Sequence, residues 1–305
     1  MATAFWTGLP QHDTAFPVTG SDWGNVGILQ TPTARMNQAG EGSLSVTHIQ
    51  PYTRVNFTLQ PLDWLEFGFR YTDVSDHLYG SVALSGNQTY KDKSIDAKIR
   101  LFKETVYTPD LSVGVRDLGG TGLFSGEYVV ASKRTGDLDW SLGLGWGYVG
   151  ARGNLKNPFS LISSKFDTRS ASTVDTGGEL STKSYFRGPT SLFGGVQYQT
   201  PWTPLILKLE YDGNDYKHEP FGDVFPTRSP LNVGAVYRIN GGLDLTVAYE
   251  RGERVMLGLA LHGNLKKNAA MPKVFDPVAP TLQVYPATDL PNAPVSAAPS
   301  SPPRW

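Results

Sequence analysis

The sequence contains no cysteine, few charged residues and no long apolar run. Without cysteine, a disulfide scaffold, a Cys-ligated metal site and a thiol nucleophile are all excluded. The net charge of -1 provides no basic surface for nucleic acid, so we expect no nucleic-acid partner. No apolar run approaches the ~18 residues that indicate a transmembrane helix. A β-barrel in a membrane remains open, because its apolar residues stand at every second position.

Glycine, proline and aromatic residues are abundant instead. The 305 residues include 33 Gly, 22 Pro, 7 Trp, 14 Tyr and 14 Phe. Glycine and proline together exceed the roughly 12% of average usage, yet they fall short of the level that indicates low-complexity disorder. We therefore expect a folded chain with many turns.

Apolar and polar residues alternate strictly in several segments. From Leu138 to Tyr148, one face consists of leucine, tryptophan and tyrosine, and the other of aspartate, serine and glycine. An amphipathic helix does not produce a period of two. The alternation predicts about twelve strands, at residues 44–50, 53–60, 64–72, 93–102, 111–117, 124–134, 138–149, 190–199, 204–213, 231–239, 243–251 and 254–263.

The connections between these strands alternate in length. Most predicted strands are near the ~9 to 11 residues that cross a bilayer at a tilt. Long polar loops at 73–92, 150–189 and 214–230 fall on one parity, and short turns such as 135–137 fall on the other. This arrangement is typical of outer-membrane barrels. The predicted fold is an all-β, antiparallel, up-and-down transmembrane β-barrel of about 12 strands.

Two segments flank the predicted barrel at residues 44–268. Residues 1–43 form an N-terminal extension that can plug the lumen, run along a barrel wall or add a strand. Residues 269–305 are rich in proline and alanine and are expected to form a linker or tail. The first six residues contain no recognisable signal peptide, so we expect a shortened chain or a region excised from a longer one.

Tryptophan and tyrosine lie near many predicted strand ends, where an aromatic girdle would meet the two membrane interfaces. Ordinary cross-strand packing in a soluble sheet is the alternative. The residues concerned are Trp64, Tyr71, Tyr128, Trp140, Tyr148, Tyr198, Trp202, Tyr211, Tyr237 and Tyr249.

The polar faces of the predicted strands carry charges of both signs. In a membrane barrel these residues point into the lumen, where mixed signs favour ion-pair networks. In a soluble barrel they form a solvated outer face. The predicted lumen charge network consists of Glu66, Arg70, Asp96, Lys98, Arg100, Arg116, Glu127, Lys133, Lys208, Glu210, Arg238, Asp244 and Glu250.

Four stretches resemble one family. Residues 23–36, with the sequence WGNVGILQTPTARM, resemble the opening motif of the YjbH/GfcD family of outer-membrane exopolysaccharide and group 4 capsule proteins. Residues 116–133 are similar to the family's mid-barrel signature, 142–147 follow at the expected distance, and 249–252 lie near the end. The matching motif residues are Gly27, Thr31, Pro32, Arg35, Arg116, Asp117, Gly119, Gly120, Thr121, Gly122, Glu250, Arg251 and Gly252.

The resemblance implies a function. It spans roughly residues 23–268 and implies a barrel in the outer membrane of a Gram-negative bacterium that supports polysaccharide transport or surface assembly. Outer-membrane lipid, polysaccharide and other exopolysaccharide-secretion proteins would be its partners. Family members are longer, with a further C-terminal part after a Pro-rich join, so the chain resembles their first barrel alone.

Some of these residues also have a physical interpretation. Arg116, Asp117 and Glu127 can pin an inward-folded loop or contact glycan hydroxyls, and pinning is favoured. Arg35 can fix the N-terminal segment to the barrel, which we favour over ligand binding. Aromatic loop residues are the candidate glycan contacts, because a pyranose face stacks on an aromatic ring: Tyr79, Tyr90, Tyr185, Phe186 and Tyr216.

Signals for catalysis are weak. Residues 145–150 match the dinucleotide fingerprint, but they lie inside a strand with no helix after it. The five histidines share no metal-ligand spacing. Residues 212–219 are rich in carboxylates, but their spacing is not that of an EF-hand. We expect no catalytic residue, no metal and no cofactor.

The predicted function is therefore a non-catalytic outer-membrane barrel that supports exopolysaccharide or capsule secretion, or surface assembly. A general porin or a structural outer-membrane barrel is the alternative. A soluble, lipocalin-like binding module is a further one.

Overall fold

The protein is described by a computed structural model that covers residues 17–169, 184–239 and 241–268. The expected tail at 269–305 and the first part of the N-terminal extension lie outside these residues. None of the described helices is long and apolar enough to cross a membrane.

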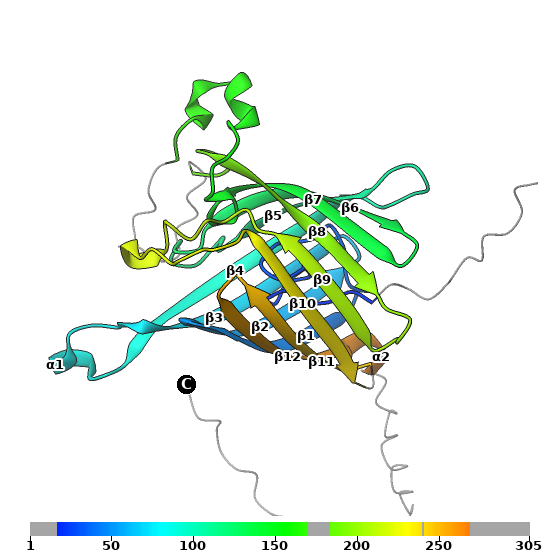
Figure 1. Ribbon diagram of the computed structural model, residues 1–305, viewed down its shortest axis with the longest axis horizontal. Helices are drawn as coiled ribbons and strands as arrows, with labels where there is room; N and C mark the ends of the chain where they lie inside the picture. The colour runs from blue at the N-terminus through cyan, green and yellow to red at the C-terminus, as the bar shows by residue number, and fades with distance from the viewer. Residues whose placement is uncertain (1–16, 170–183, 240, 269–305) are drawn as a thin grey trace, which may run out of the picture. The chain divides into compact units, whose positions relative to one another are not determined.

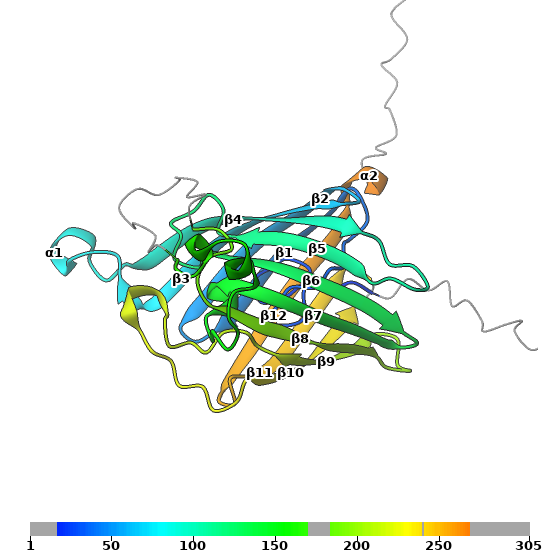
Figure 2. The ribbon, with the colours of Figure 1, turned by 90° about the horizontal axis from the view of Figure 1, so that it is seen from above.

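Twelve antiparallel strands form a closed barrel (Figures 1 and 2). Each strand pairs with its neighbours in the sequence, and β1 pairs with β12 to close the sheet. The predicted fold and strand number are confirmed. The strands are β1 Glu41–Ile49, β2 Tyr52–Leu62, β3 Leu65–Leu78, β4 Thr89–Phe102, β5 Asp110–Arg116, β6 Gly126–Thr135, β7 Leu138–Gly147, β8 Thr190–Gln199, β9 Leu205–Tyr211, β10 Leu231–Ile239, β11 Leu243–Glu250 and β12 Arg254–Asn264.

The connections separate into two ends. The four long ones, β3–β4, β5–β6, β7–β8 and β9–β10, lie at one end, here called the loop end, on the left in Figure 1. The short β1–β2 and β11–β12 turns lie at the same end, and the opposite turn end carries the five remaining connections together with the start of β1 and the end of β12. Short helices lie in or beside these connections: α1 Val82–Ser85, η1 Tyr148–Gly150, η2 Pro158–Leu161, η3 Ser164–Phe166, η4 Pro220–Gly222 and, after β12, α2 Leu265–Asn268.

The β3–β4 hairpin is longer than predicted. Strand β3 runs to Leu78 and β4 begins at Thr89, so the connection is shorter than the expected 73–92. The extension projects beyond the other strands and carries α1 at its tip (Figure 1). It has no apolar alternation to predict it, because its pairing is polar: Lys91 and Asp73 form an ion pair across it at 2.5 Å.

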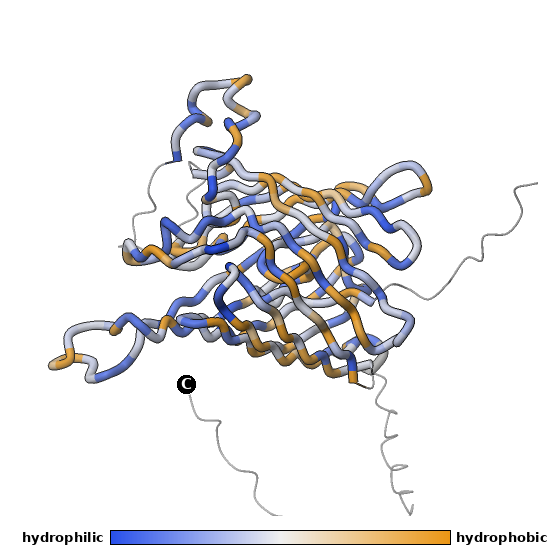
Figure 3. Tube along the Cα trace, in the orientation of Figure 1, coloured by the Kyte–Doolittle hydropathy of each residue, from blue (hydrophilic) through white to orange (hydrophobic). Residues whose placement is uncertain are grey.

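Polarity is distributed inside out. Outward-facing side chains such as Leu44, Phe57 and Leu257 are apolar and about half exposed, and orange segments follow the strands in Figure 3. Inward-facing side chains such as Arg54 and Glu66 are polar and buried. The outward ring of apolar residues is what a bilayer requires of a barrel.

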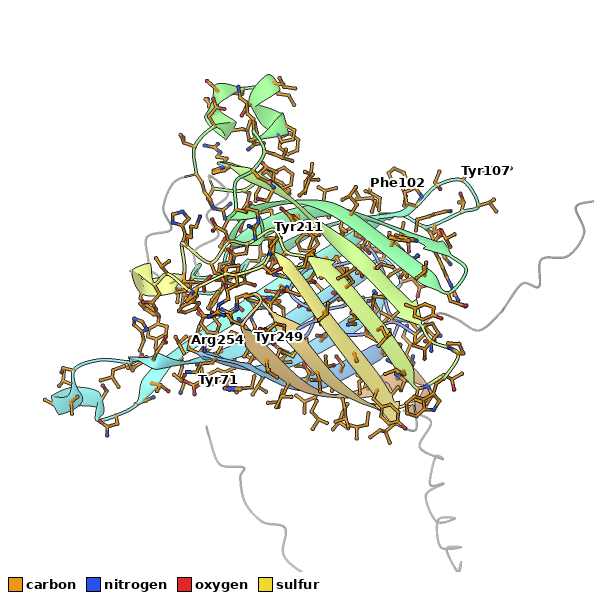
Figure 4. The ribbon with its side chains drawn as sticks, in the orientation of Figure 1. Tyr71, Phe102, Tyr107, Tyr211, Tyr249 and Arg254 are labelled. Atoms are coloured by element: carbon orange, nitrogen blue, oxygen red, sulfur yellow. The ribbon has the colours of Figure 1, made fainter. Side chains whose placement is uncertain are left out.

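The aromatic residues partly follow the expected girdle. Figure 4 shows Tyr71, Tyr211 and Tyr249 toward the loop end and Phe102 and Tyr107 at the turn end. Two predicted girdle residues are placed differently: Tyr128 and Tyr148 are buried. Tyr128 packs in a buried cluster with Ala34, and Tyr148 packs in another with Trp23 and Phe124. Both face inward because the lumen of this barrel is filled rather than open.

The segment that precedes β1 lies inside the barrel. We call residues 17–38 the inner segment. Nearly all of its residues from 19 to 34 are buried, although it contributes no strand and only the isolated bridges Gly20–Val26 and Gly27–Pro32. Its partners are the inward-facing side chains of the strands, such as Arg54, Glu66 and Glu210.

Candidate functional site: the filled lumen

Trp23 of the inner segment lies between three arginines of the barrel. The guanidinium carbons of Arg54, Arg70 and Arg116 lie 4.2, 4.6 and 4.5 Å from the centroid of its ring. The indole Nε1 donates a hydrogen bond of 2.8 Å to Gln30. Cations over an aromatic face attract it most strongly away from water, and this ring is only 1% exposed. Strands β2, β3 and β5 thus hold one side chain.

Each of these arginines also has a polar partner. Arg54 forms an ion pair with Asp22 of the inner segment, and Arg70 with Asp96 of β4 at 2.7 Å. Arg116 donates to the Gln30 carbonyl oxygen at 2.7 Å. Burying a charge is costly unless it is paired, so these contacts make the cationic cluster tolerable.

Strand β9 holds the turn at residues 27–32 with charges of both signs. The Glu210 carboxylate accepts hydrogen bonds from the backbone N–H groups of Leu29, Gln30 and Thr31 at 2.8, 3.0 and 2.9 Å. The Lys208 ammonium donates to three carbonyl oxygens of the inner segment, including that of Ile28 at 2.5 Å. Buried backbone groups outside a sheet need such partners.

On the opposite wall, a carboxylate and an ammonium group also hold the inner segment. Glu66 of β3 accepts from the Asn25 amide at 3.0 Å and from the Val26 N–H at 3.3 Å. Lys98 of β4 lies 3.1 Å from Glu66 and donates to the Arg35 carbonyl oxygen at 2.9 Å. The inner segment is therefore held from both sides of the barrel.

Arg35 ties the end of the inner segment to the turn end. Its guanidinium forms ion pairs of 2.6 Å with Glu104, 2.7 Å with Asp110 and 2.6 Å with Asp139. These carboxylates come from the β4–β5 connection, β5 and β7. The Arg35 guanidinium is therefore engaged by carboxylates of the barrel, as expected if Arg35 fixes the N-terminal segment to the barrel.

The remaining inward charges lie around the same segment. Glu250 accepts from the Gln30 amide at 2.6 Å. Arg238 pairs with Asp244 at 2.7 Å and donates to the Val18 carbonyl oxygen. Arg100 is half-buried and lines a cavity of about 450 Å³ at the turn end.

Two residues of the predicted lumen network, Glu127 and Lys133, are wrongly assigned. Both lie on the outward face of β6, whose inward residues include Tyr128, Val130 and Ser132. Apolar side chains face inward here because Tyr128 and Val130 pack against Ala34 of the inner segment. The period-two pattern was therefore assigned to the wrong faces in this strand.

The outward charges have other partners. Glu127 lies under the β7–β8 connection and pairs with Arg169 at 2.7 Å. Lys133 donates to carbonyl oxygens of the β4–β5 connection, including that of Val106 at 3.0 Å. Glu127 therefore takes no part in the predicted cluster with Arg116 and Asp117.

The β5–β6 connection folds inward over Trp23. Phe124 is fully buried and meets the Trp23 ring edge-on at 5.5 Å. Asp117 accepts a hydrogen bond from the Phe124 N–H, and its own N–H donates to Asp96. Burial, and then the charge of Asp92, raises the pKa of Asp117 to about 7.

The other motif residues make their contacts within the protein. A Cβ at Gly120 would stand 2.0 Å from Asp117 Oδ1, so no larger residue fits that bend. Gly122 and Gly252 have positive φ. Thr121 donates to Asp92, and Thr31 to Glu210. Gly27 and Pro32 form the bridge of the inner segment, Gly119 lies near Ile95, and Arg251 lies over the Tyr216 ring at 4.7 Å.

The candidate glycan residues are dispersed. Tyr79 is 59% exposed and stacks on the half-buried Tyr90 at 6.0 Å. Tyr185 is half-buried. Phe186 packs against Trp146 at 5.2 Å on the outer wall. Tyr216 is wrongly assigned: it is 4% exposed and donates to Asp212, so it cannot stack on a sugar.

The carboxylates of the β9–β10 connection serve internal contacts. Glu219 accepts from the hydroxyls of Tyr52 and Tyr148 at 2.6 and 3.0 Å. Burial, and then the charge of Glu210, raises the pKa of Asp212 to about 6. The Glu219 and Asp212 carboxylates are thus occupied by protein donors, whereas Asp223 of the same connection lies with Asp76 and His77 in a group whose ligand atoms are all within 4.8 Å of one another.

Sequence reasoning missed the Trp23 cluster and the part of Asp22, Asn25 and Gln30. Trp23 stands in a segment without periodicity, so nothing in the pattern marks its ring as buried among cations. One signal was available: the large number of inward-facing charged side chains, because charges buried in a closed barrel need polar partners inside it.

The chain is similar to proteins of one family. A family described as "Exopolysaccharide biosynthesis protein YbjH" matches residues 19–298. The uncharacterized lipoprotein YjbH of Escherichia coli strain K12 is 48% identical over 267 residues, which are 87% of this chain and 38% of the relative. The chain thus spans well under half of that relative's length.

Solved structures of barrels are more distant. A KdgM porin in complex with disordered oligogalacturonate has a TM-score of 0.38 at 8% identity, over 73% of this chain and 97% of the porin. The NanC porin has a TM-score of 0.35 at 8% identity, over 73% of this chain and 98% of the porin.

Proposed function

The chain belongs to the YjbH family of exopolysaccharide biosynthesis proteins, and on this premise we propose that it is an outer-membrane barrel that supports exopolysaccharide or capsule secretion or surface assembly. Its lumen is closed by the inner segment, and it acts without a catalytic step. Because the chain spans 38% of the curated relative, the activity of the whole protein belongs to this proposal.

The observation that carries the proposal is the inside-out polarity of a closed barrel. Apolar side chains cover the outer wall, and arginine, lysine and glutamate fill the interior. A lipocalin-like module in water would need the opposite distribution, with an apolar interior and a polar surface. The polarity therefore favours a lipid partner over the soluble alternative.

The filled lumen opposes the general-porin alternative. Porins conduct small solutes through an open aqueous channel, whereas here Trp23, Glu210 and Arg35 connect the inner segment to many strands. We propose that polymer does not pass through this lumen while the inner segment is in place. The barrel would then serve secretion through its loop end and through other exopolysaccharide-secretion proteins.

Cell fractionation and polymer analysis test the function. In a bacterium that carries the complete protein, deletion of its gene should lower surface exopolysaccharide, and reintroducing the gene should restore it. The protein should be recovered in the outer-membrane fraction as a band that shifts on boiling. Unchanged surface polysaccharide after deletion would contradict the proposal, as would recovery in the soluble fraction without detergent.

A further inference from the structure

A cavity of about 570 Å³ opens among three connections at the loop end. Leu123 and Ser125 line it from the β5–β6 connection, Arg169 and Arg187 from the β7–β8 connection, and His218 from the β9–β10 connection. Its size lies within the roughly 300 to 1,000 Å³ of small-ligand pockets. The cavity lies outside the contacts that hold the inner segment in the lumen.

The described lining is cationic. Two arginines and a histidine line the cavity, and no described carboxylate does. Arg169 is already paired with Glu127 at 2.7 Å. Arg187 is half-buried and lies 5.8 Å from the Phe166 ring, and no ion pair joins it to a carboxylate among residues 17–169, 184–239 and 241–268. Within the described part of the chain its planar donors therefore have no carboxylate partner, which suits them to an oxyanion in the cavity.

Glycine and small residues leave room beside these cations. Gly147, Gly150 and Ala151 form part of the wall together with Ser125, so backbone and hydroxyl groups border the space. A sugar ring needs hydrogen-bonding neighbours of this kind, and an attached carboxylate or phosphate needs an arginine fork. The Tyr148 side chain also borders the cavity, with its hydroxyl donating to Glu219.

We propose that this cavity binds an anionic saccharide unit, with its carboxylate or phosphate on Arg187. The proposal rests on the proposed function, because it assumes that the loop end meets polymer outside the cell. It names the substrate class as acidic sugar, carried either by a free polymer or by the sugar phosphates of lipopolysaccharide.

Calorimetric titration of the purified chain in detergent tests the site. The probes are trigalacturonate, the neutral maltotriose, and lipopolysaccharide in matched micelles. Trigalacturonate or lipopolysaccharide should bind, and maltotriose should bind at least about tenfold more weakly. The acidic probe that binds identifies the source of the sugar. Equal binding of the acidic and neutral probes, or binding of neither acidic probe, would overturn the proposal.

Variants separate the site from general surface charge. Arg187→Gln should weaken the affinity for the acidic probe at least about tenfold. Arg187→Lys keeps the charge but loses the planar fork, so its affinity should lie between those of the wild type and Arg187→Gln. The matched control is Arg228→Gln, an exposed arginine at the same end that lies outside the cavity. A band that shifts on boiling as in the wild type verifies folding. Undiminished binding by folded Arg187→Gln would overturn the proposal.

The outcome is independent of the secretion experiment. Binding is measured on purified protein, so loss of binding in Arg187→Gln can be observed whether or not gene deletion changes surface polysaccharide. A failed secretion test with Arg187-dependent binding would contradict the proposed function alone. A successful secretion test without such binding would contradict this site alone.

Discussion

Trp23 shows how one residue can organise a charged interior. Its ring contacts Arg54, Arg70 and Arg116, which would otherwise face one another at close range. Like charges in a buried space repel, and an aromatic face between them reduces that cost. The side chain also meets Phe124, so it joins the inner segment to a loop-end connection.

The substitution Trp23→Ala should therefore destabilise the barrel. Removal of a buried tryptophan costs about 3–5 kcal/mol, and the three guanidinium groups lose a shared partner. The free energy of unfolding in urea, followed by the boiling-sensitive gel shift, measures the effect. Trp202→Ala is the control, because Trp202 is 59% exposed. Equal losses in the two variants would contradict the structural role of Trp23.

The raised pKa of Asp117 predicts that the stability of the folded chain depends on pH. Burial, and then the charge of Asp92, raises its pKa from the ordinary 3.8 to about 7. Between about pH 4 and pH 7 the folded chain keeps a proton that the unfolded chain has released, so stability falls as pH rises through this window. Below and above the window the contribution is constant. Asp212, with a pKa raised to about 6, acts in the same direction.

The variant Asp117→Asn should reduce this dependence. Asparagine tolerates the positive φ of 55° at this position, and its side-chain oxygen can still accept from the Phe124 N–H. The temperature at which the folded band disappears should fall less between about pH 5 and pH 8 than in the wild type. Asp137→Asn, at an exposed turn, is the control. Identical pH slopes in Asp117→Asn and the wild type would refute the assignment.

The inward direction of a charged side chain could be predicted only where the sequence shows which face of its strand points into the lumen. Glu66, Lys98 and Glu210 alternate with exposed apolar residues, so their direction follows from the period. Glu127 and Lys133 flank the continuous apolar run of residues 129–131, which does not determine the inward face, and β6 turns both charges outward because apolar Ala34 meets that wall from within. The contents of the lumen decided the direction, and the strand's own sequence does not encode them.

At the scale of elements, the strands were predictable because one face of each strand meets lipid and the other meets the polar lumen. Lipid-facing and lumen-facing residues alternate through each membrane-crossing segment. Beyond Tyr71 and before Lys93 the β3–β4 hairpin has no apolar face to maintain, so its true length gave no signal. The inner segment gave none either, because it has neither helix nor ladder and its backbone is satisfied by side chains such as Glu210.

The clamp on residues 27–32 can be tested through Glu210. In Glu210→Gln one acceptor oxygen becomes an NH₂ donor, so backbone N–H groups of Leu29 and Thr31 lose their shared oxygen. An unsatisfied buried donor costs about 1–3 kcal/mol. Amide hydrogen exchange in residues 27–32 should therefore accelerate by roughly 10- to 100-fold.

The control for this variant is Glu253→Gln, on the β11–β12 hairpin, where Glu253 pairs with Arg254 away from the inner segment. Its exchange in residues 27–32 should match the wild type. Unchanged exchange in Glu210→Gln would mean that Glu210 does not hold the turn.

At the scale of the whole molecule, a filled barrel differs from a channel. Twelve strands enclose more space than the ~8 whose side chains fill the interior alone. Here the chain supplies the missing filling from its own inner segment, and charges of both signs hold that segment to most of the wall. The strand count was predictable from the sequence. The closure depended on long-range pairs such as Arg35 with Asp139, which no local pattern reports.

Ion conductance across a planar lipid bilayer tests the closure most directly. The wild-type chain should insert without a steady conductance, and a variant that lacks residues 17–38 should give a stable open channel, because these residues occupy the lumen between the inward-facing side chains of the strands. The full-length double variant Trp23→Ala/Glu210→Gln should give intermittent openings. A steady wild-type conductance equal to that of the deletion variant would contradict the closed barrel.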